Sequence, residues 1–558
     1  MRERAVPLRL AIIGAGPTCL YLLNALCDRV TGCVIDIYEK GERTGSGFPY
    51  GSDKATRLML ANIASIEMPP LRETLLGFLQ RQGGAVLAEH GVSRHTVHER
   101  SFIPRVLIGR HFEEQFNLIV EDLRARGNAV RVRGGSPVDD IVPCDGKVVV
   151  CAKDGARVHD IAVLATGHQF PKSRTSETRY YPSPYTGLLD EQVPAVKIGI
   201  LGSSLSAIDA AFALADQRGS FTRDDDDALR YVLNDSSNAL SITMMSRKGL
   251  LPEADFYCPI PYEPLELATA EALRALVKGA VPDLLDRIFH LMCSELERAD
   301  PQWCAAIGLD NLDADSFAPA YFAARKRYAP FRWAQYNLDE VQQNKADRKT
   351  VAWRYALLRM HEMVETCVPH FGQTDRERFD AGLAQVFIDN YAAVPSESIR
   401  RLLALRAAGV LDLVELGRDY TCDKEQCAVV TQGGQEIGFD LMIDATGQRR
   451  LAATDLPFDT LRACIGRTSE LQYDHRFCLN HEGLGTSQVI MLALPYLLAR
   501  KPFAQGLVAC DDIARSAAEA IVRSGADTGA ADAEDLIAFT GDPAAGPALV
   551  SKPERAAL

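Results

Sequence analysis

The spacing of apolar residues changes character within residues 8–40. LRLAII at 8–13 is almost continuously apolar, GAGP is a glycine turn, and apolar residues then recur at helical spacing in CLYLLNAL. This order predicts a buried strand over Leu10–Ile13, a tight turn, and a helix from about Pro17. A second apolar run, CVIDIYEK at 33–40, predicts a strand that ends at Glu39.

The turn between the first strand and helix suits a dinucleotide. Gly14 and Gly16 let the backbone approach a pyrophosphate, and the helix that begins near Pro17 directs its N-terminal N–H groups at the phosphate. Cys19 stands where the usual pattern has a third glycine or alanine. Glu39 can accept hydrogen bonds from the ribose hydroxyls, with Lys40 beside it. These features predict an FAD site.

The same pattern returns in VKIGILGSSLSAIDAAFAL at 196–214. Gly202 takes the place of the first glycine and Ser204 that of the second, with Ser206 and a small Ala207 in the following helix. The next predicted strand, ALSITMMSRKG at 239–249, ends in Arg247 and Lys248 rather than in an acid. A basic strand end accommodates a 2′-phosphate, so this second site predicts NADPH.

A third pattern is a strand that stops at Ala-Thr-Gly, and it too occurs twice. DIAVLATGHQF spans 160–170 and DLMIDATGQRR spans 440–450. We expect these to be the strands on which the chain leaves the FAD-binding domain and later returns to it. Thr166 and Gly167 in the first copy, and Thr446 and Gly447 in the second, are then expected near a cofactor.

The region 264–410 has long stretches rich in Ala, Leu, Arg and Glu with few glycines, which predicts helices. The predicted fold is therefore α/β: two dinucleotide-binding, Rossmann-like domains, the NADPH domain inserted in the FAD domain, plus a mostly helical insertion. The expected divisions are FAD-binding 1–195 and 441–524, NADPH-binding 196–263 and 411–440, helical 264–410, and a partly flexible tail 525–558.

Composition narrows the range of functions. The formal net charge of −13 argues against nucleic acid, whose binding depends on clustered Lys and Arg. The 14 cysteines include no Cys-x-x-Cys pair, so neither a zinc site nor a dithiol centre is predicted, and scattered thiols are typical of a reducing cytoplasm. No segment has the apolar length of a membrane span.

The motifs together resemble the flavin-dependent N-hydroxylating monooxygenases. DIAVLATGHQFP carries that group's Asp-x-x-x-Leu-Ala-Thr-Gly signature, with His168 where Tyr is frequent. GSGFPYG (45–51), LMLANIASIEMPPL (58–71) and FRWAQYNLDEVQQNKADRKTVAWRYALLRMHE (331–362) are similar to the subgroup of L-aspartate N-monooxygenases, also called nitrosuccinate synthases. The resemblance extends to about residue 525.

The resemblance implies an activity. NADPH would reduce FAD, the reduced flavin would take up O2 as a C4a-hydroperoxide, and the amine of a small amino acid, aspartate above all, would be oxidised. It also implies that Pro49, Tyr50, Leu60 and Asn62 lie against the flavin, with Asn62 as the catalytic candidate. The alternative for Asn62 is a turn cap.

Other site residues follow from charge. Arg105 opens a predicted helix and is a candidate flavin or phosphate ligand, or else a surface residue. A dicarboxylate needs a fork-shaped cation. The candidates in the helical region are Arg325, Arg327, Arg332, Lys345, Arg348 and Arg354. Of these we choose Arg327, Lys345, Arg348 and Arg354. The alternative for each is a place on a solvated helix face.

Two rival functions stay open. One is N-oxygenation of a different amino acid or amine, and the other is a non-oxygenating NADPH–flavin reductase or oxidase. A disulfide reductase is disfavoured by the absence of Cys-x-x-Cys, and a hydrolase by the absence of a Gly-x-Ser-x-Gly elbow. The sequence leaves a homo-oligomer open.

Overall fold

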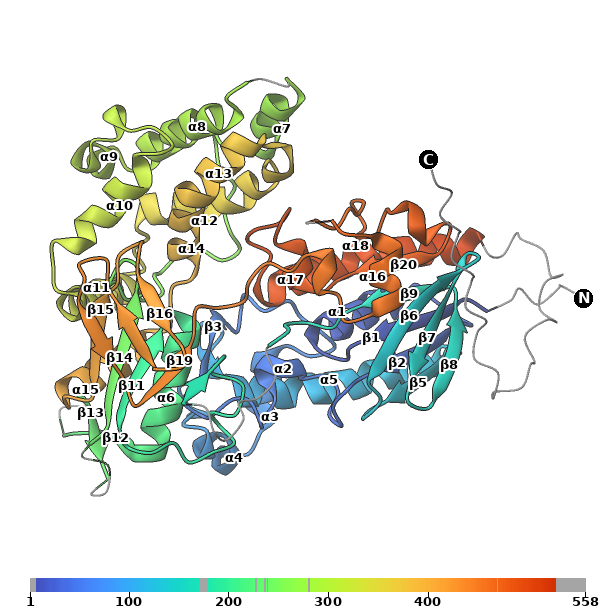
Figure 1. Cartoon of the computed structure of the whole chain (residues 1–558), viewed down its shortest axis with the longest axis horizontal. Helices are drawn as coiled ribbons and strands as arrows, with labels where there is room; N and C mark the ends of the chain where they lie inside the picture. The colour runs from blue at the N-terminus through green and yellow to red at the C-terminus, as the bar shows by residue number, and fades with distance from the viewer. Residues whose placement is uncertain are drawn as a thin grey trace, which may run out of the picture.

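A computed structural model describes residues 7–170, 179–225, 228–234, 237, 239–279, 282–468 and 470–527, with side chains to residue 524. Within them, two five-stranded parallel sheets form the cores of two α/β domains, and a helical domain stands beside the second sheet (Figure 1). The expected fold class is confirmed. The predicted tail falls largely outside the described residues.

The first sheet has the strand order β20-β9-β1-β2-β5. Its strands are β1 (Arg9–Ile13), β2 (Val34–Tyr38), β5 (Ala129–Arg133), β9 (Ile161–Leu164) and β20 (Gln488–Met491). Helix α1 (Pro17–Leu26) packs against α5 (Arg105–Ala125) and against the long C-terminal helix α18 (Gly506–Asp527). These elements bury a continuous apolar core, because the central strands β1 and β9 are apolar on both faces.

Shorter elements complete the first domain. They are α2 (Gly47–Tyr50), β3 (Leu60–Ala64), α3 (Leu75–Arg81), α4 (Gly84–Glu89) and β4 (Phe102–Pro104), the antiparallel strands β6 (Val138–Cys144), β7 (Lys147–Ala152) and β8 (Gly155–His159), and α16 (Asp459–Ile465) and α17 (Leu494–Leu497). The helix expected at Arg105 and the last helix expected from about Gly506 both begin at those residues.

The second sheet has the order β10-β19-β11-β14-β15. Its strands are β10 (Tyr180–Tyr181), β11 (Lys197–Leu201), β14 (Ser241–Ser246), β15 (Leu411–Glu415) and β19 (Leu441–Asp444). Helix α6 (Leu205–Arg218) follows β11, as the repeated motif predicts. Outlying strands are β12 (Gly219–Arg223), β13 (Leu229–Leu233), β16 (Thr421–Asp423), β17 (Ala428–Val430) and β18 (Glu436–Gly438).

Strand β19 corrects one expected domain boundary. It pairs in parallel with β11, from Ile198 with Leu441 to Leu201 with Asp444, so it belongs to the second sheet. The division that assigned residues from 441 to the FAD-binding domain is therefore placed too early. Each Ala-Thr-Gly instead follows a strand from which the chain leaves a sheet. After β9 the chain passes from the first domain to the second, and after β19 it passes back to the first domain.

The helical domain lies between β14 and β15 in the chain. It comprises α7 (Ala270–Lys278), α8 (Leu284–Ala299), α9 (Pro301–Ile307), α10 (Phe317–Lys326), α11 (Pro330–Asp347), α12 (Ala352–Glu365), α13 (Gln373–Ala381) and α14 (Leu383–Tyr391), and α15 (Ser396–Ala407) leads back to the second sheet. The described part of the chain has no helix of the length and apolarity that crossing a membrane requires.

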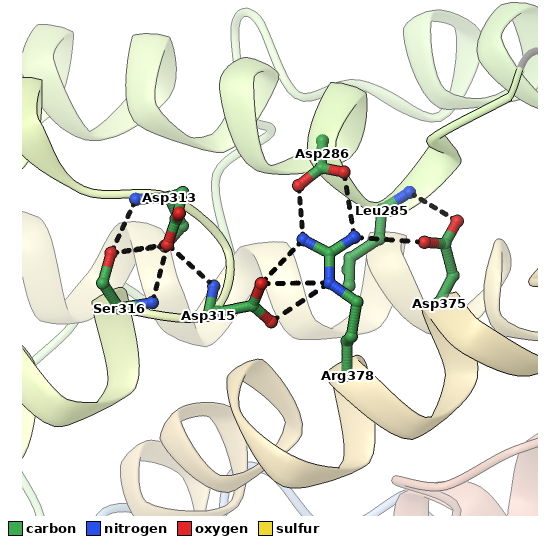
Figure 2. Close-up of polar contacts among 7 residues, drawn as sticks. All are labelled: Leu285, Asp286, Asp313, Asp315, Ser316, Asp375 and Arg378. Atoms are coloured by element: carbon green, nitrogen blue, oxygen red, sulfur yellow. Dashed lines mark hydrogen bonds and ion pairs between the residues drawn. The ribbon is translucent and has the colours of Figure 1, made fainter.

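One arginine ties several elements of the helical domain together (Figure 2). Arg378 on α13 forms a bidentate pair with Asp286 on α8, at 2.7 and 2.9 Å. Its Nε also donates to both carboxylate oxygens of Asp315, at 3.1 Å, next to the start of α10. Because a bidentate arginine fixes its partners in one plane, these contacts set how α8, α10 and α13 sit together.

Candidate functional site

The carboxyl edge of the first sheet opens into a cavity of about 590 Å³, here called the first-sheet cavity. The residues predicted for the FAD site that line it are Gly14, Gly16, Pro17, Glu39, Lys40, Pro49, Tyr50, Thr166 and Gly167. Glu39 accepts hydrogen bonds from Ala15 N and Gly41 N, both at 2.9 Å, which holds its carboxylate at the rim. The N-terminal residues of α18, Gly506 and Leu507, form another wall.

The first Ala-Thr-Gly is packed against the first glycine of the motif. Gly14 has φ of 103°, and a Cβ placed on it would lie 2.8 Å from the carbonyl carbon of Ala165. Gly202 repeats this relationship in the second sheet, with φ of 118° and an added Cβ 3.0 Å from the carbonyl carbon of Ala445. Glycine is required at both positions because only it combines positive φ with so close an approach.

The carboxyl edge of the second sheet has its own cavity, the second-sheet cavity, of about 360 Å³. The predicted NADPH residues Gly202, Ser204, Arg247, Lys248 and Thr446 line it. Ser204 is the N-cap residue of α6, so the N–H groups of that helix face the same edge. Burial lowers the pKa of the Lys248 ammonium to about 8.

An interdomain cavity of about 520 Å³ lies between the two. Ser206, Thr446 and Gly447 line it from the second domain, and Gln169 and Phe170 line it from the segment that follows the first Ala-Thr-Gly. Phe170 stacks on Phe48 with ring centroids 4.7 Å apart and meets Tyr185 at 5.2 Å. This aromatic group separates the interdomain cavity from the first-sheet cavity, where Phe48 is also a lining residue.

The largest of the four cavities, about 1200 Å³, is strongly charged and is here called the charged cavity. It lies among β3, β4, the loop 255–260, α11 and the start of α15. Its acidic lining residues are Glu67, Glu99, Asp255 and Glu397, and its basic ones are Arg100, Lys345, Arg348 and Arg400.

Two carboxyls of the charged cavity are poorly hydrated. Burial raises the pKa of Asp255 although Lys345 Nζ lies 3.1 Å from it. Burial also raises the pKa of Glu67, which accepts hydrogen bonds from Tyr262 Oη at 2.8 Å and Ala64 N at 2.9 Å. Among the described residues neither Arg100 nor Arg348 forms an ion pair, although Arg100 Nη1 donates to Cys258 O at 3.0 Å and its charge acts on both Asp255 and Glu67. The cavity therefore presents partly buried acids together with guanidinium groups that no carboxylate pairs directly.

Several predicted residues lie elsewhere. Arg105 is not a lining residue of the first-sheet cavity: its Nη1 pairs with Asp209 Oδ2 at 2.6 Å, across the two domains. Leu60 lines the charged cavity instead, and Asn62 is exposed and lines none of the four cavities. The flavin contacts that the resemblance implied for these residues are therefore absent from the described cavity wall.

The four basic residues chosen as substrate ligands fall into two groups. Lys345 and Arg348 line the charged cavity. Arg327 is exposed at the end of α10 and lines none of the four cavities. Arg354 is only 3% exposed, and Glu253 lies 2.9 Å from its guanidinium, so its charge is already neutralised. Arg327 and Arg354 do not fit a substrate role.

Sequence reasoning missed some lining residues. Tyr420, just after β15, lines the second-sheet cavity, and Arg418 acts electrostatically on Lys248 there. Their place after a parallel strand was a usable signal, because the carboxyl ends of parallel strands meet at one edge. Gln385 of α14 lines the same cavity but belongs to the helical domain, and nothing in its local sequence marks it.

The chain matches two protein families and one close relative. Residues 11–169 match the family described as FAD-NAD(P)-binding, and residues 269–391 match the YdhS-like middle domain. The match to the FAD-NAD(P)-binding family confirms the prediction of FAD and a nicotinamide dinucleotide as cofactors. The uncharacterized protein YdhS of Escherichia coli (strain K12) is 44% identical over 520 residues, which cover 92% of this chain and 97% of that protein.

Solved structures give more distant likenesses. The ornithine N-hydroxylase of Kutzneria sp. 744 is 15% identical, with a TM-score of 0.47, covering 93% of this chain and 100% of its own. The L-lysine 6-monooxygenase of Pseudomonas syringae is 12% identical, with a TM-score of 0.42, covering 92% of this chain and 99% of its own.

Proposed function

The chain belongs to the YdhS family, and from this premise we propose that it is a flavoprotein in which NADPH reduces bound FAD. One observation carries the proposal: the interdomain cavity lies between the nucleotide cavities of the two sheets and is lined by residues next to both. Thr446 lines both the second-sheet cavity and the interdomain cavity. His168 lines the first-sheet cavity, and the next residue, Gln169, lines the interdomain cavity. Both Ala-Thr-Gly segments therefore border the path between the two nucleotides.

The residues at the first-sheet cavity fit FAD. The N-terminus of α1 and the open backbone at Gly14 and Gly16 suit a pyrophosphate, and the carboxylate of Glu39 suits ribose hydroxyls. The positive end of α18 at Gly506 would favour negative charge on the flavin ring. When bound, FAD would supply the electron transfer and oxygen activation that protein side chains lack.

We propose further that the reaction is N-oxygenation of a small amino acid, with L-aspartate as the first candidate. The resemblance of segments 45–51, 58–71 and 331–362 supports this class. The charged cavity supports an amino acid with extra carboxylate. Glu67 would hold the substrate ammonium and accept its proton at a carboxylate oxygen, and Arg100 and Arg348 would hold carboxylates, whereas Lys345 and Asp255 already pair with each other at 3.1 Å.

The charged cavity is linked to the first-sheet cavity by close packing. Arg105 N, at the start of α5, donates to Met59 O at 3.0 Å, just before the strand that carries Leu60. One turn further along α5, Gly109 lies directly on the backbone of Tyr50, where no side chain would fit. Helix α5 thus braces the strand of the charged cavity against the wall of the first-sheet cavity.

The test is consumption of NADPH by the FAD-loaded protein in the presence of aspartate, glutamate, asparagine, lysine and ornithine, with products identified by mass spectrometry. Stimulation by aspartate with an N-oxidised product would support the full proposal. Stimulation by another amine would move the substrate to that amine. NADPH use that yields hydrogen peroxide alone would leave an NADPH–flavin oxidase, and no NADPH use would refute the proposal.

A further inference from the structure

We propose that the helical domain is part of the NADPH site and that Gln385 positions Lys248 to bind the 2′-phosphate of the cofactor. The proposal rests on the proposed use of NADPH and adds a specificity-determining residue from a domain with no assigned role. Four residues of the helical domain, Phe322 on α10 and Gln385, Ile388 and Asp389 on α14, line the second-sheet cavity together with the basic strand end.

Lys248 is held from both sides by the helical domain. Its Nζ donates to Gln385 Oε1 at 2.7 Å and lies 3.9 Å from the ring centroid of Phe322. Gln385 is itself fixed, because its Nε2 donates to Ala381 O at 2.7 Å. A lysine stem is otherwise flexible, so these contacts place the ammonium in one position at the cavity wall.

The charges around Lys248 suit an anion. Arg247 lines the cavity beside it, and Arg418 adds a second nearby positive charge. One acid, Asp389, also lines the cavity, but Arg325 Nη1 lies 2.5 Å from its carboxylate and Tyr321 Oη donates to it at 3.0 Å. Asp389 still acts electrostatically on Lys248, but the lining carries two cations, Arg247 and Lys248, against this one acid, so the strand end keeps a net positive wall.

Gln385 suits the positioning role because its amide is neutral. Its oxygen accepts one N–H of the ammonium, and an ammonium has three, so two remain for phosphate oxygens. A carboxylate in the same place would bind Lys248 more strongly and would repel a phosphate. A glutamate at 385 should thus turn a site for a 2′-phosphate into one for free ribose hydroxyls, which accept an acidic neighbour.

A second contact joins the same end of the helical domain to the cofactor path. Asp380, at the end of α13, receives a bidentate pair from Arg450, with both distances 2.9 Å. Arg450 follows the second Ala-Thr-Gly, whose Thr446 and Gly447 border the interdomain cavity. The α13–α14 end of the helical domain therefore contacts the nucleotide site at the strand end and at the crossing segment.

The experiment is equilibrium binding of NADP⁺ and of NAD⁺ to the FAD-loaded protein by isothermal titration calorimetry. The variants are Gln385→Glu, Gln385→Ala and, as a matched control, Gln373→Glu, an exposed glutamine on α13 that lines none of the four cavities. We expect the wild type to prefer NADP⁺. Gln385→Glu should lose about tenfold or more in NADP⁺ affinity, roughly the loss of one charge-assisted contact, with NAD⁺ affinity nearly unchanged.

Gln385→Ala should weaken NADP⁺ binding less than Gln385→Glu does, because it frees Lys248 without competing for it, and Gln373→Glu should bind both nucleotides as the wild type does. Equal loss of NADP⁺ and NAD⁺ affinity in Gln385→Glu, or no loss of either, overturns the proposal for Gln385. If the wild type still prefers NADP⁺, that result leaves the proposed function intact. A wild type that binds neither nucleotide contradicts the proposed function itself. FAD content and far-UV circular dichroism of each variant separate misfolding from altered recognition.

Discussion

Arg105 Nη1 and Asp209 Oδ2 lie 2.6 Å apart across the boundary between the two nucleotide-binding domains. Arg105 begins α5 of the first domain and Asp209 lies in α6 of the second. Their side chains are only 11% and 5% exposed, and Tyr185 Oη donates to the same carboxylate oxygen at 2.7 Å. This buried contact holds the two domains in the orientation that aligns their cavities.

Replacing Arg105 with methionine should therefore destabilise the protein. The substitution leaves Asp209 buried without its cation, which costs about 3–5 kcal/mol. Urea unfolding measures the change, and Arg110→Met, an exposed arginine on the same helix, should change stability by less than about 0.5 kcal/mol. The double variant Arg105→Met with Asp209→Leu should recover much of the loss, and a double variant as unstable as the single one would contradict the pairing.

Substituting the two glycines that pack against the Ala-Thr-Gly segments should affect different cofactors. Gly14→Ala should lower the FAD content of the purified protein, and Gly202→Ala should weaken NADP⁺ binding with FAD retained, because each Cβ would collide with a carbonyl group. Absorbance at the flavin band and calorimetric titration measure the two effects.

Gly409→Ala provides the control for those two variants. Gly409 also has positive φ, 73°, but an added Cβ there meets nothing within 4 Å. It should cost about 1–2 kcal/mol in backbone strain and leave both cofactors bound. Equal loss of cofactor in all three variants would show that strain alone, not the close approach, is responsible.

The pKa of Lys248 predicts a pH dependence of NADP⁺ binding. Since burial lowers this pKa to about 8, the ammonium is present below pH 8 and is lost above it. NADP⁺ affinity should fall from pH 7 to pH 9, whereas NAD⁺ affinity should stay flat. Lys248→Arg keeps its charge throughout this range and should remove the slope. A slope that persists in Lys248→Arg would assign the titration to another group.

The ion pair between Arg378 and Asp286 in the helical domain predicts that the stability of the protein depends on pH. Hydrogen bonds from Arg378 lower the pKa of Asp286, so this carboxylate contributes stability that is present above its unfolded pKa and is lost as pH falls through the folded value. Arg378→Ala should cost about 1–2 kcal/mol at pH 7, a figure discounted because the side chain of Asp286 is 37% exposed.

The difference between wild type and Arg378→Ala should shrink as the pH is lowered from 5 toward 3, which thermal unfolding of the two proteins measures. Arg274→Ala removes an exposed pair with Glu271 on α7, and because solvent screens this pair it should leave stability nearly unchanged at any pH. A difference between wild type and Arg378→Ala that does not depend on pH would mean that Arg378 acts through packing alone.

Much of the fold follows from local pattern. The strand at Leu10–Ile13, the helix starts at Pro17 and Arg105, and the repeated motif at 196–214 are each signalled by residues next to one another in the chain, and each is observed. The partner of a parallel strand carries no such signal, because pairing depends on how distant segments pack. The local pattern therefore identifies the end of β19 at Ala-Thr-Gly but does not place this strand in the second sheet, beside β11.

The same limit separates the predicted site residues. The glycines and Glu39 line their cavity because their roles depend on local backbone geometry. Arg105, Arg354 and Gln385 are defined by partners far away in the chain: Asp209, Glu253 and Lys248. An isolated arginine or glutamine in a helical stretch gives no indication of whether it meets solvent, a carboxylate or a lysine, so these roles required the structure.

The most direct test of the account is anaerobic mixing of the FAD-loaded protein with NADPH or with NADH, followed at the absorbance band of oxidised flavin. If the two nucleotide cavities form one electron-transfer path, NADPH should bleach the flavin in a single saturable phase and NADH should do so far more slowly. Flavin that stays oxidised with NADPH, or that NADH reduces equally fast, would contradict the assignment of the second-sheet cavity.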